Sequence, residues 1–180
     1  KGVDVKAFMI VLNALASPEI NDPGAPRRAE RWLSRLKENR VLQPTAECYQ
    51  AVIQAWANSS KEEVVVIVNR AERWLNDIVA ESEENPERIK ETIECYNAFL
   101  DACTRGRSGS NKKDSSIVQR NAKKADSIVR HLHSHYHHYG SEYHLIPNTE
   151  TFNYVIRGWT RCKGDDLIAK KILALLRLME

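Results

Sequence analysis

One succession of residue types recurs four times along this chain, so the fold must be built from repeats. An aromatic residue marks each copy, namely Phe8, Tyr49, Tyr96 and Phe152. Apolar residues follow three, four and seven positions after each aromatic, and the sixth position is always small (Ala14, Ala55, Ala102 and Gly158). This spacing predicts an amphipathic helix, and the small residue predicts that another helix packs closely against it.

A second register follows each of these predicted helices and is anchored by alanine. Ala29, Ala71, Ala125 and Ala169 each begin an apolar pattern that ends seven residues later at Leu36, Ile78, Leu132 or Leu176. Two helices per copy predict an all-α fold, an αα-solenoid of about four helix-turn-helix repeats. We expect one repeat region over 1–180, with repeats near 3–43, 44–90, 91–146 and 147–180.

The repeat resembles the pentatricopeptide repeat, whose first helix begins Pro-Asp-x-x-Thr-Tyr-Asn-x-Leu-Ile. The nearest copy is Pro147-Asn-Thr-Glu-Thr-Phe-Asn-Tyr-Val-Ile156, followed by Pro44-Thr-Ala-Glu-Cys-Tyr-Gln-Ala-Val-Ile53. The resemblance implies a module that binds single-stranded RNA through its first helices. It also implies a role in RNA processing, stability or translation in a mitochondrion or plastid. The chain has no initiator methionine and no targeting pattern, so we expect it to be a window from a longer protein.

The spacing departs from this family, whose repeat is regular at roughly 35 residues, close to that of its tetratricopeptide relatives. Here the aromatic markers fall at 8, 49, 96 and 152. The segments 17–26 and 105–121 are rich in helix-breaking or polar residues and are expected to be surface loops. The run Val64–Val68 has no breaker before Ala71, so an early start of the second helix is favoured over a short strand.

The resemblance implies that each base is read by two residues, the one after the aromatic and the last one of the repeat. The implied pairs are Met9 with Thr45, Gln50 with Thr92, and Asn97 with Asn148, while Asn153 has its partner beyond residue 180. Only the pair of asparagines is a common family combination, and it usually goes with pyrimidines. An amide can donate to or accept from the edge of an exposed base.

The distribution of charged residues gives conflicting indications about whether the chain binds RNA. The residue two before each aromatic is Lys6, Glu47, Glu94 or Glu150, and three carboxylates there oppose a polyanion. By resemblance, phosphate contacts fall on Arg105 and Arg161, nine residues after the aromatic. Lys112 and Lys113 lie in the basic segment 105–130, which is either a mobile phosphate-binding arm or a solvated insertion. The net charge of +3 decides little.

The carboxylates favour a second hypothesis, a protein-interaction scaffold of tetratricopeptide type that binds a basic or helical peptide. A spacer for a catalytic domain outside this window is a third alternative. No catalytic constellation, cofactor motif or long apolar span is found, so we expect no enzyme activity, no cofactor, no small-molecule substrate and no membrane partner.

Cysteines, tryptophans and histidines are interpreted as structural. Cys48, Cys95, Cys103 and Cys162 form no ligand pair and are expected to be reduced packing residues, and Trp32 and Trp74 are expected to pack in the core. All six histidines fall between His131 and His144. Some are spaced four apart, as metal ligands on a helix would be, but a polar helix end without metal is the favoured interpretation.

Overall fold

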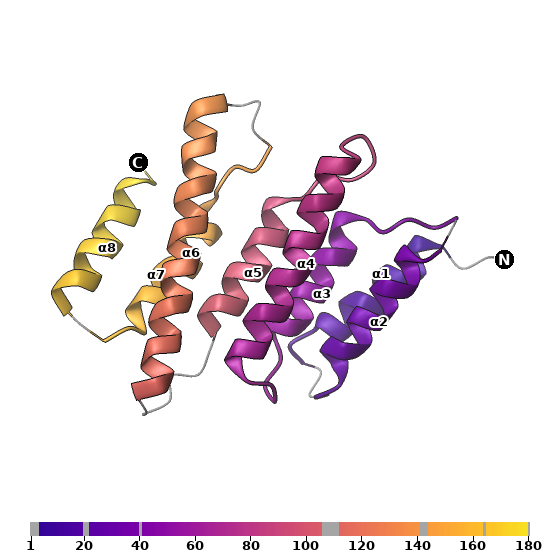
Figure 1. Cartoon of the computed structure of the whole chain (residues 1–180), viewed down its shortest axis with the longest axis horizontal. Coiled ribbons are helices and arrows are strands. Elements are labelled where there is room, and N and C mark those ends of the chain that lie inside the picture. The colour runs from indigo at the N-terminus through magenta and orange to yellow at the C-terminus, as the bar shows by residue number, and fades with distance from the viewer. Residues whose placement is uncertain are drawn as a thin grey trace. The chain divides into compact units, whose positions relative to one another are not determined.

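The computed structural model describes residues 4–19, 22–39, 41–105, 112–140, 144–163 and 165–179, and these are helical with no strand (Figure 1). An all-α fold is therefore confirmed for the described residues. The helices are α1 (Val5–Ala16), α2 (Ala25–Lys37), α3 (Ala46–Ala57), α4 (Val64–Glu84), α5 (Ile93–Arg105), α6 (Lys112–Tyr139), α7 (Thr149–Thr160) and α8 (Asp165–Arg177).

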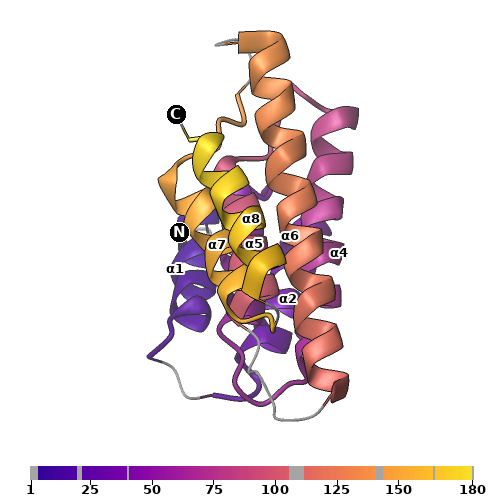
Figure 2. The ribbon, with the colours of Figure 1, turned by 90° about the vertical axis from the view of Figure 1, so that its left-hand side faces the viewer.

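The chain divides into two compact units, residues 1–102 and 103–180. In the first unit, α1 packs against α2 and α3, and α3 packs against α2 and α4. In the second unit, α7 packs against α6 and α8, and α6 extends past both of them (Figure 2). Each helix that carries an aromatic marker thus packs against the second helix of its own repeat where these contacts are described.

In the first unit, α1, α3 and the part of α5 up to Ala102 lie side by side in the same direction, while the last residues of α5, from Cys103, belong to the second unit. At their N-terminal ends, the Thr45 hydroxyl lies 3.5 Å from the Met9 sulfur, and the Cys95 thiol lies 3.5 Å from the carbonyl oxygen of Ala46. Because residues near equivalent helix positions meet, the helices are parallel. Consecutive first helices in this unit are therefore direct neighbours.

A second contact joins first helices at their C-terminal ends. The Asn58 side chain donates to the carbonyl oxygen of Ala16 at 2.6 Å, and the Arg161 guanidinium donates to the carbonyl oxygen of Thr104. Both donors are nine residues after their aromatic marker, and both acceptors are eight after the preceding marker. The last carbonyls of a helix lack intrahelical partners. Each unit therefore uses the same repeat position to satisfy one of them.

The always-small position is buried in three of its four copies. Ala55, Ala102 and Gly158 are buried, as close helix packing requires. A Cβ atom added at Gly158 would lie 2.8 Å from the Thr104 side chain, so this contact has no room for alanine without a shift. The expectation is wrong for Ala14, which is exposed because no described helix covers that face of α1.

The structure tests the expectations for the irregular segments. α4 begins at Val64, so the early helix start is confirmed. The described residues 17–19 and 22–24 lie between α1 and α2 outside any helix, but the expected loop over 17–26 is wrong for Ala25 and Pro26, which begin α2. The expected loop over 105–121 is wrong from Lys112 onward, where α6 already runs. Its apolar residues at helical spacing, Val118, Ala122, Ala125 and Val129, are buried, and this pattern extends the second-helix register toward the N-terminus.

Of the two tryptophans on second helices, Trp74 packs in the core as expected, whereas Trp32 is only partly covered. Trp74 is buried and lies edge-on to Tyr49, with ring centroids 6.2 Å apart. Trp32 is half-buried and lies edge-on to Phe8 at 5.8 Å. Both contacts join a second helix to the aromatic marker of a first helix. The edge-on arrangement of the rings is one that aromatic pairs favour.

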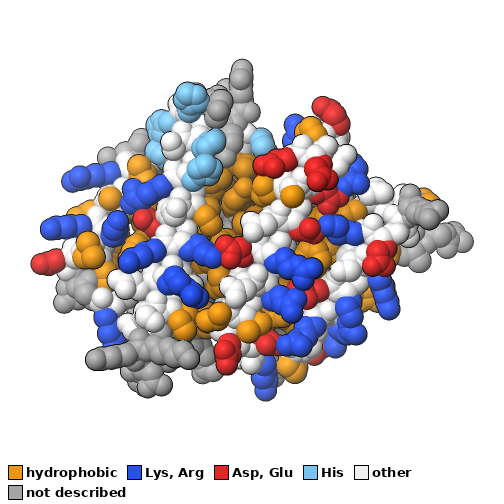
Figure 3. Space-filling model, viewed as in Figure 1, with side chains coloured by type: hydrophobic (Ala, Val, Ile, Leu, Met, Phe, Trp, Pro, Cys, Tyr) orange, Lys and Arg blue, Asp and Glu red, His pale blue; other side chains and the backbone are white. Residues whose placement is uncertain are grey.

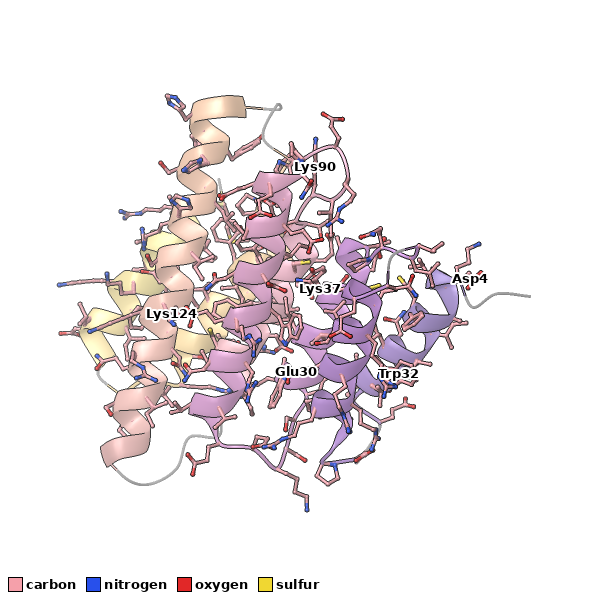
Figure 4. The ribbon with its side chains drawn as sticks, turned by 45° about the vertical axis from the view of Figure 1, so that its right-hand side comes forward. Asp4, Glu30, Trp32, Lys37, Lys90 and Lys124 are labelled. Carbon is pink, nitrogen blue, oxygen red and sulfur yellow. The ribbon has the colours of Figure 1, made fainter. Side chains whose placement is uncertain are left out.

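Glu30 connects three helices of the first unit (Figure 4). One of its carboxylate oxygens accepts from the indole N–H groups of Trp56 on α3, at 3.0 Å, and Trp74 on α4, at 2.7 Å. Its other oxygen lies 3.7 Å from the guanidinium of Arg70. The Glu30 side chain is 15% exposed. Hydrogen bonds to a charged acceptor in such a setting are stronger than neutral ones.

The second unit has residues equivalent to Glu30 and Trp56, but the hydrogen bond between them is missing. Trp159 corresponds to Trp56, and Asp126 corresponds to Glu30. The indole nitrogen of Trp159 and one carboxylate oxygen of Asp126 are buried, and neither has a hydrogen-bond partner among the described residues. α6 and α7 do pack together. We attribute the missing bond to the side chain of aspartate, which is one methylene shorter than that of glutamate.

Glu30→Ala should lower the free energy of unfolding by about 2–4 kcal/mol, because two buried indole N–H groups lose their acceptor. Urea denaturation followed by circular dichroism measures this. Glu83→Ala on the exposed face of α4 is the control and should change stability by less than about 0.5 kcal/mol. Equal effects of the two substitutions would contradict the role of Glu30.

Asp126→Glu should stabilise the protein by about 0.5–1.5 kcal/mol, because the longer side chain can accept from Trp159. The same denaturation experiment measures the gain. In a Trp159→Phe background the indole N–H is absent, so the gain should disappear. A gain that persists there would show that another interaction is responsible.

Candidate nucleic-acid interface

The second residue of each implied reading pair stands at the start of a first helix. Thr45 and Asn148 are the N-caps of α3 and α7, and Thr92 directly precedes α5. Asn148 forms a capping box, in which its side chain accepts from the Thr151 backbone N–H at 3.0 Å while the Thr151 hydroxyl accepts from the Asn148 N–H at 3.1 Å. Asp4 caps α1 in a similar way. Threonine, asparagine and aspartate are preferred N-caps, so local helix chemistry already explains these residue types.

Met9 and Thr45, the first implied pair, lie in contact with each other. The Thr45 hydroxyl lies 3.5 Å from the Met9 sulfur and 3.6 Å from the Cys48 sulfur. Both members of the pair are half-buried. The two residues are 36 positions apart in sequence, so the packing of α1 against α3 brings them together.

No contact between Gln50 and Thr92 is found among the described interactions of these two residues. The Thr92 hydroxyl lies 3.7 Å from the Cys95 sulfur, one turn into α5. Gln50 is half-buried on α3. Its amide can still reach a ligand at the surface of the first unit.

The two asparagines after the later aromatic markers differ sharply in exposure. Asn97 is only 4% exposed, so a base can contact it only if neighbouring groups move. Asn153 occupies the same repeat position on α7 and is exposed. Asn148, the implied partner of Asn97, is exposed, although its side-chain oxygen already serves the capping box. Asn153 is therefore the most accessible of the implied base-reading amides.

The carboxylates beside the implied reading positions face solvent. Glu47, Glu94 and Glu150 are exposed, as is Lys6 at the same position of the first repeat. Farther along the stripe, Asp101 is buried and accepts from the Gln54 amide at 3.1 Å. The exposed negative charge is thus concentrated at one position of the repeat, near the N-terminal ends of the first helices.

The implied phosphate contacts have local partners. The Arg161 guanidinium caps α5 through the Thr104 carbonyl, and neighbouring Arg157 donates to the Thr104 hydroxyl at 3.2 Å. Arg105 is exposed. Lys112 and Lys113 begin α6, and their side chains lie outside the described residues. The expected mobile arm is wrong for 112–130, which is helical, and 106–111 lies outside the described residues.

A basic surface that sequence reasoning overlooked lies on the second helices of the first unit (Figure 3). α2 contributes Arg27, Arg28, Arg31, Arg35 and Lys37, and α4 contributes Arg70 and Arg73. Arg27 pairs with Glu62 at 2.8 Å, and Arg35 lies over the Trp32 ring at 5.3 Å. The signal was the spacing of the arginines by three and four in 27–37. Such a face can attract an anionic partner or simply solvate the helix.

The cysteines are free thiols, and the structure places Cys48, Cys95 and Cys103 in the core and Cys162 half-buried. Burial raises the pKa of the Cys95 thiol, and hydrogen bonds from Thr92 oppose that rise only in part. Burial also raises the pKa of Cys162. Both sulfurs are therefore protonated at neutral pH and poorly nucleophilic, which fits packing residues.

One polar cluster around the buried Tyr49 joins α2, α3 and α4. The Tyr49 hydroxyl donates to Glu81, whose carboxylate also pairs with Arg88 and lies 3.5 Å from the Lys37 amine. Burial and the charge of Asp77 raise the pKa of Tyr49 far above its ordinary value. The phenol is consequently neutral at any physiological pH, and the cluster ties helices together.

The histidines gather toward the end of α6. His133 lies edge-on to Phe152 with ring centroids 6.3 Å apart, and burial together with the charge of His137 lowers its pKa. Among the described residues, no group of three or more histidine, cysteine, aspartate or glutamate side chains is arranged to hold a metal ion.

In the part of the chain that the structure describes, no helix combines the length and apolar character needed to span a bilayer. The comparisons with known proteins found no matching family model, no matching curated protein and no matching solved structure.

Asn148→Ala should destabilise the protein by about 1 kcal/mol, because it removes the capping box of α7. Asn153→Ala, on the exposed face of the same helix, should change stability by less than about 0.5 kcal/mol. Thermal and urea denaturation of both variants measure the difference. Equal stability of the two variants would show that the box contributes nothing, and Asn148 would then be explained better by recognition.

Proposed function

We propose that this chain is a pentatricopeptide-like αα-solenoid that binds single-stranded RNA, in a mitochondrion or plastid, and acts there in RNA processing, stability or translation. The observation that carries the proposal is the contact between Met9 and Thr45. The resemblance pairs these residues for reading one base, and they are neighbours where α1 packs against α3. The repeated bond from Asn58 to Ala16 and from Arg161 to Thr104 supports a regular stacking of repeats.

Accessible amides supply the recognition chemistry. Gln50 is half-buried and Asn153 is exposed, and each follows the aromatic marker of its helix. A primary amide offers a donor and an acceptor to the edge of an unstacked base. Asn97 takes part only after its neighbours move, and Asn148 contributes its exposed side chain beside the cap. Met9 and Thr45 offer mainly apolar and hydroxyl contact.

Phosphate binding falls to exposed cations. Arg105 is exposed at the C-terminal end of α5, and Lys112 and Lys113 begin α6. Each phosphate neutralised by such a residue releases counterions, so the affinity for RNA falls as salt rises. The carboxylates of Glu47, Glu94 and Glu150 work against this binding.

Those same carboxylates favour the second candidate, a scaffold for a basic or helical peptide. Glu47, Glu94 and Glu150 are exposed at one repeat position on three first helices. A carboxylate that recurs at the same position of each repeat suits lysine or arginine side chains on a partner, and complementary charge governs the rate and specificity of such binding.

Gln50→Ala and Asn153→Ala should each weaken binding of a pyrimidine-rich single-stranded RNA by about threefold to tenfold, the value of one neutral hydrogen bond. Fluorescence anisotropy at near-physiological salt measures this. Asn76→Ala replaces an exposed amide on α4, outside the first helices, and should leave the affinity unchanged. If the wild-type chain does not bind, or if all three variants bind equally, base reading by these residues is wrong.

The triple substitution E47Q/E94Q/E150Q separates the two candidates, because it has opposite effects on them. Removal of three carboxylates should strengthen RNA binding several-fold at low salt if phosphates approach this position. A basic peptide library should instead lose affinity for the variant if the surface is a peptide scaffold. Unchanged binding of both RNA and peptide would show that these three carboxylates take part in neither function.

A further inference from the structure

His133 and His137 occupy successive turns of the same face of α6. Their Nε2 atoms are 3.1 Å apart, and their ring centroids are 4.3 Å apart. Two neutral imidazoles at this distance share one hydrogen, so one nitrogen donates and the other accepts. The two ring nitrogens therefore lie side by side on one face of the helix.

We propose that His133 and His137 together chelate a divalent transition-metal ion of the zinc and copper class. Two nitrogens 3.1 Å apart can both lie about 2.0–2.1 Å from one ion, with an angle of about 95–102° between the two bonds. That angle lies between the square-planar and tetrahedral values, which copper and zinc respectively favour. Solvent completes the coordination, since the described residues supply no third protein ligand.

The surroundings of His133 hold its ring in place. The ring packs against Phe152 of α7, and a hydrogen bond with the backbone of Leu178, just after α8, partly opposes the lowering of its pKa. A metal-binding histidine commonly donates its second ring N–H to a carbonyl, which fixes its orientation and makes it a better ligand. His133 is therefore held by residues outside α6, namely Phe152 of α7 and Leu178, which follows α8.

Access and charge also permit binding. His137 is exposed at the part of α6 where the histidines gather (Figure 3). The nearest cation on the helix is Arg130, one turn before His133, and its guanidinium is paired with Asp126 at 3.1 Å. The ring of Tyr136 lies 6.0 Å from that of His137. The pairing of Arg130 with Asp126 reduces the repulsion of an incoming cation.

The same helix provides a matched control. His131 and His135 have the same spacing of four, and their ring centroids are 4.2 Å apart. A shift of two residues turns a helix by about 200°, so this pair lies on a different face. His131 is exposed. Judged by sequence spacing alone, the two histidine pairs should bind metal equally well. The contacts that hold His133 in place favour the pair of His133 and His137.

The test is titration of the chain, prepared without an affinity tag, with CuSO₄ and ZnCl₂, followed by calorimetry and by electron paramagnetic resonance for copper. We expect one site per chain with nitrogen ligands. H133Q and H137Q should each weaken binding at least about tenfold, because even the outer partners of a bound metal are worth about 10–100-fold. The double variant H131Q/H135Q should change affinity less than threefold, and circular dichroism should show each variant folded.

Absence of binding, or equal loss in H131Q/H135Q, would overturn the proposal. Since His133 is packed between helices, H133Q can disturb folding, and in that case H137Q at the exposed position decides alone. Hydrogen exchange gives an independent measurement. Metal bound by His133 should slow exchange of the α8 amides in the wild-type chain but not in H137Q, and no difference between the two would contradict the link to Leu178.

Discussion

The last carbonyl groups of a first helix need donors, and the next first helix supplies one. Asn58 serves Ala16 in the first unit, and Arg161 serves Thr104 in the second. This bond requires the two helices to approach closely at their C-terminal ends, and the small residue in the Gly158 position allows that approach. The hydrogen bond can form only if the helices approach closely, and the small residue permits that approach. Together they set the spacing between consecutive first helices.

This constraint also changes how the candidate interface should be understood. The charge of Arg161 is engaged in capping α5, and the side-chain oxygen of Asn148 is engaged in capping α7. A residue that satisfies a helix end can contribute to recognition only with its remaining groups. The exposed amide of Asn153 does not cap a helix in the described contacts. Recognition of a ligand therefore depends mainly on amides of this kind.

The sequence predicted the helices well because both apolar registers are local patterns, and α4 begins where the Val64 run predicts. It failed where the outcome depends on neighbours in space. Asn97 and Asn153 share one repeat position, yet one is buried and the other exposed. The polar residues before Val118 suggested a loop, but α6 begins at Lys112. The Glu30 bonds join residues 26 and 44 positions away, which no local pattern reveals.

The contacts that tie one first helix to the next join residues only 42 and 57 positions apart. Arrays with such nearest-neighbour contacts can nucleate at one helix pair and propagate to the next. During synthesis, α1 and α2 are therefore able to form a template before α3 has left the ribosome, and α3 completes it by capping Ala16. Folding can follow translation in the order of the repeats, so few apolar faces are exposed at any one time.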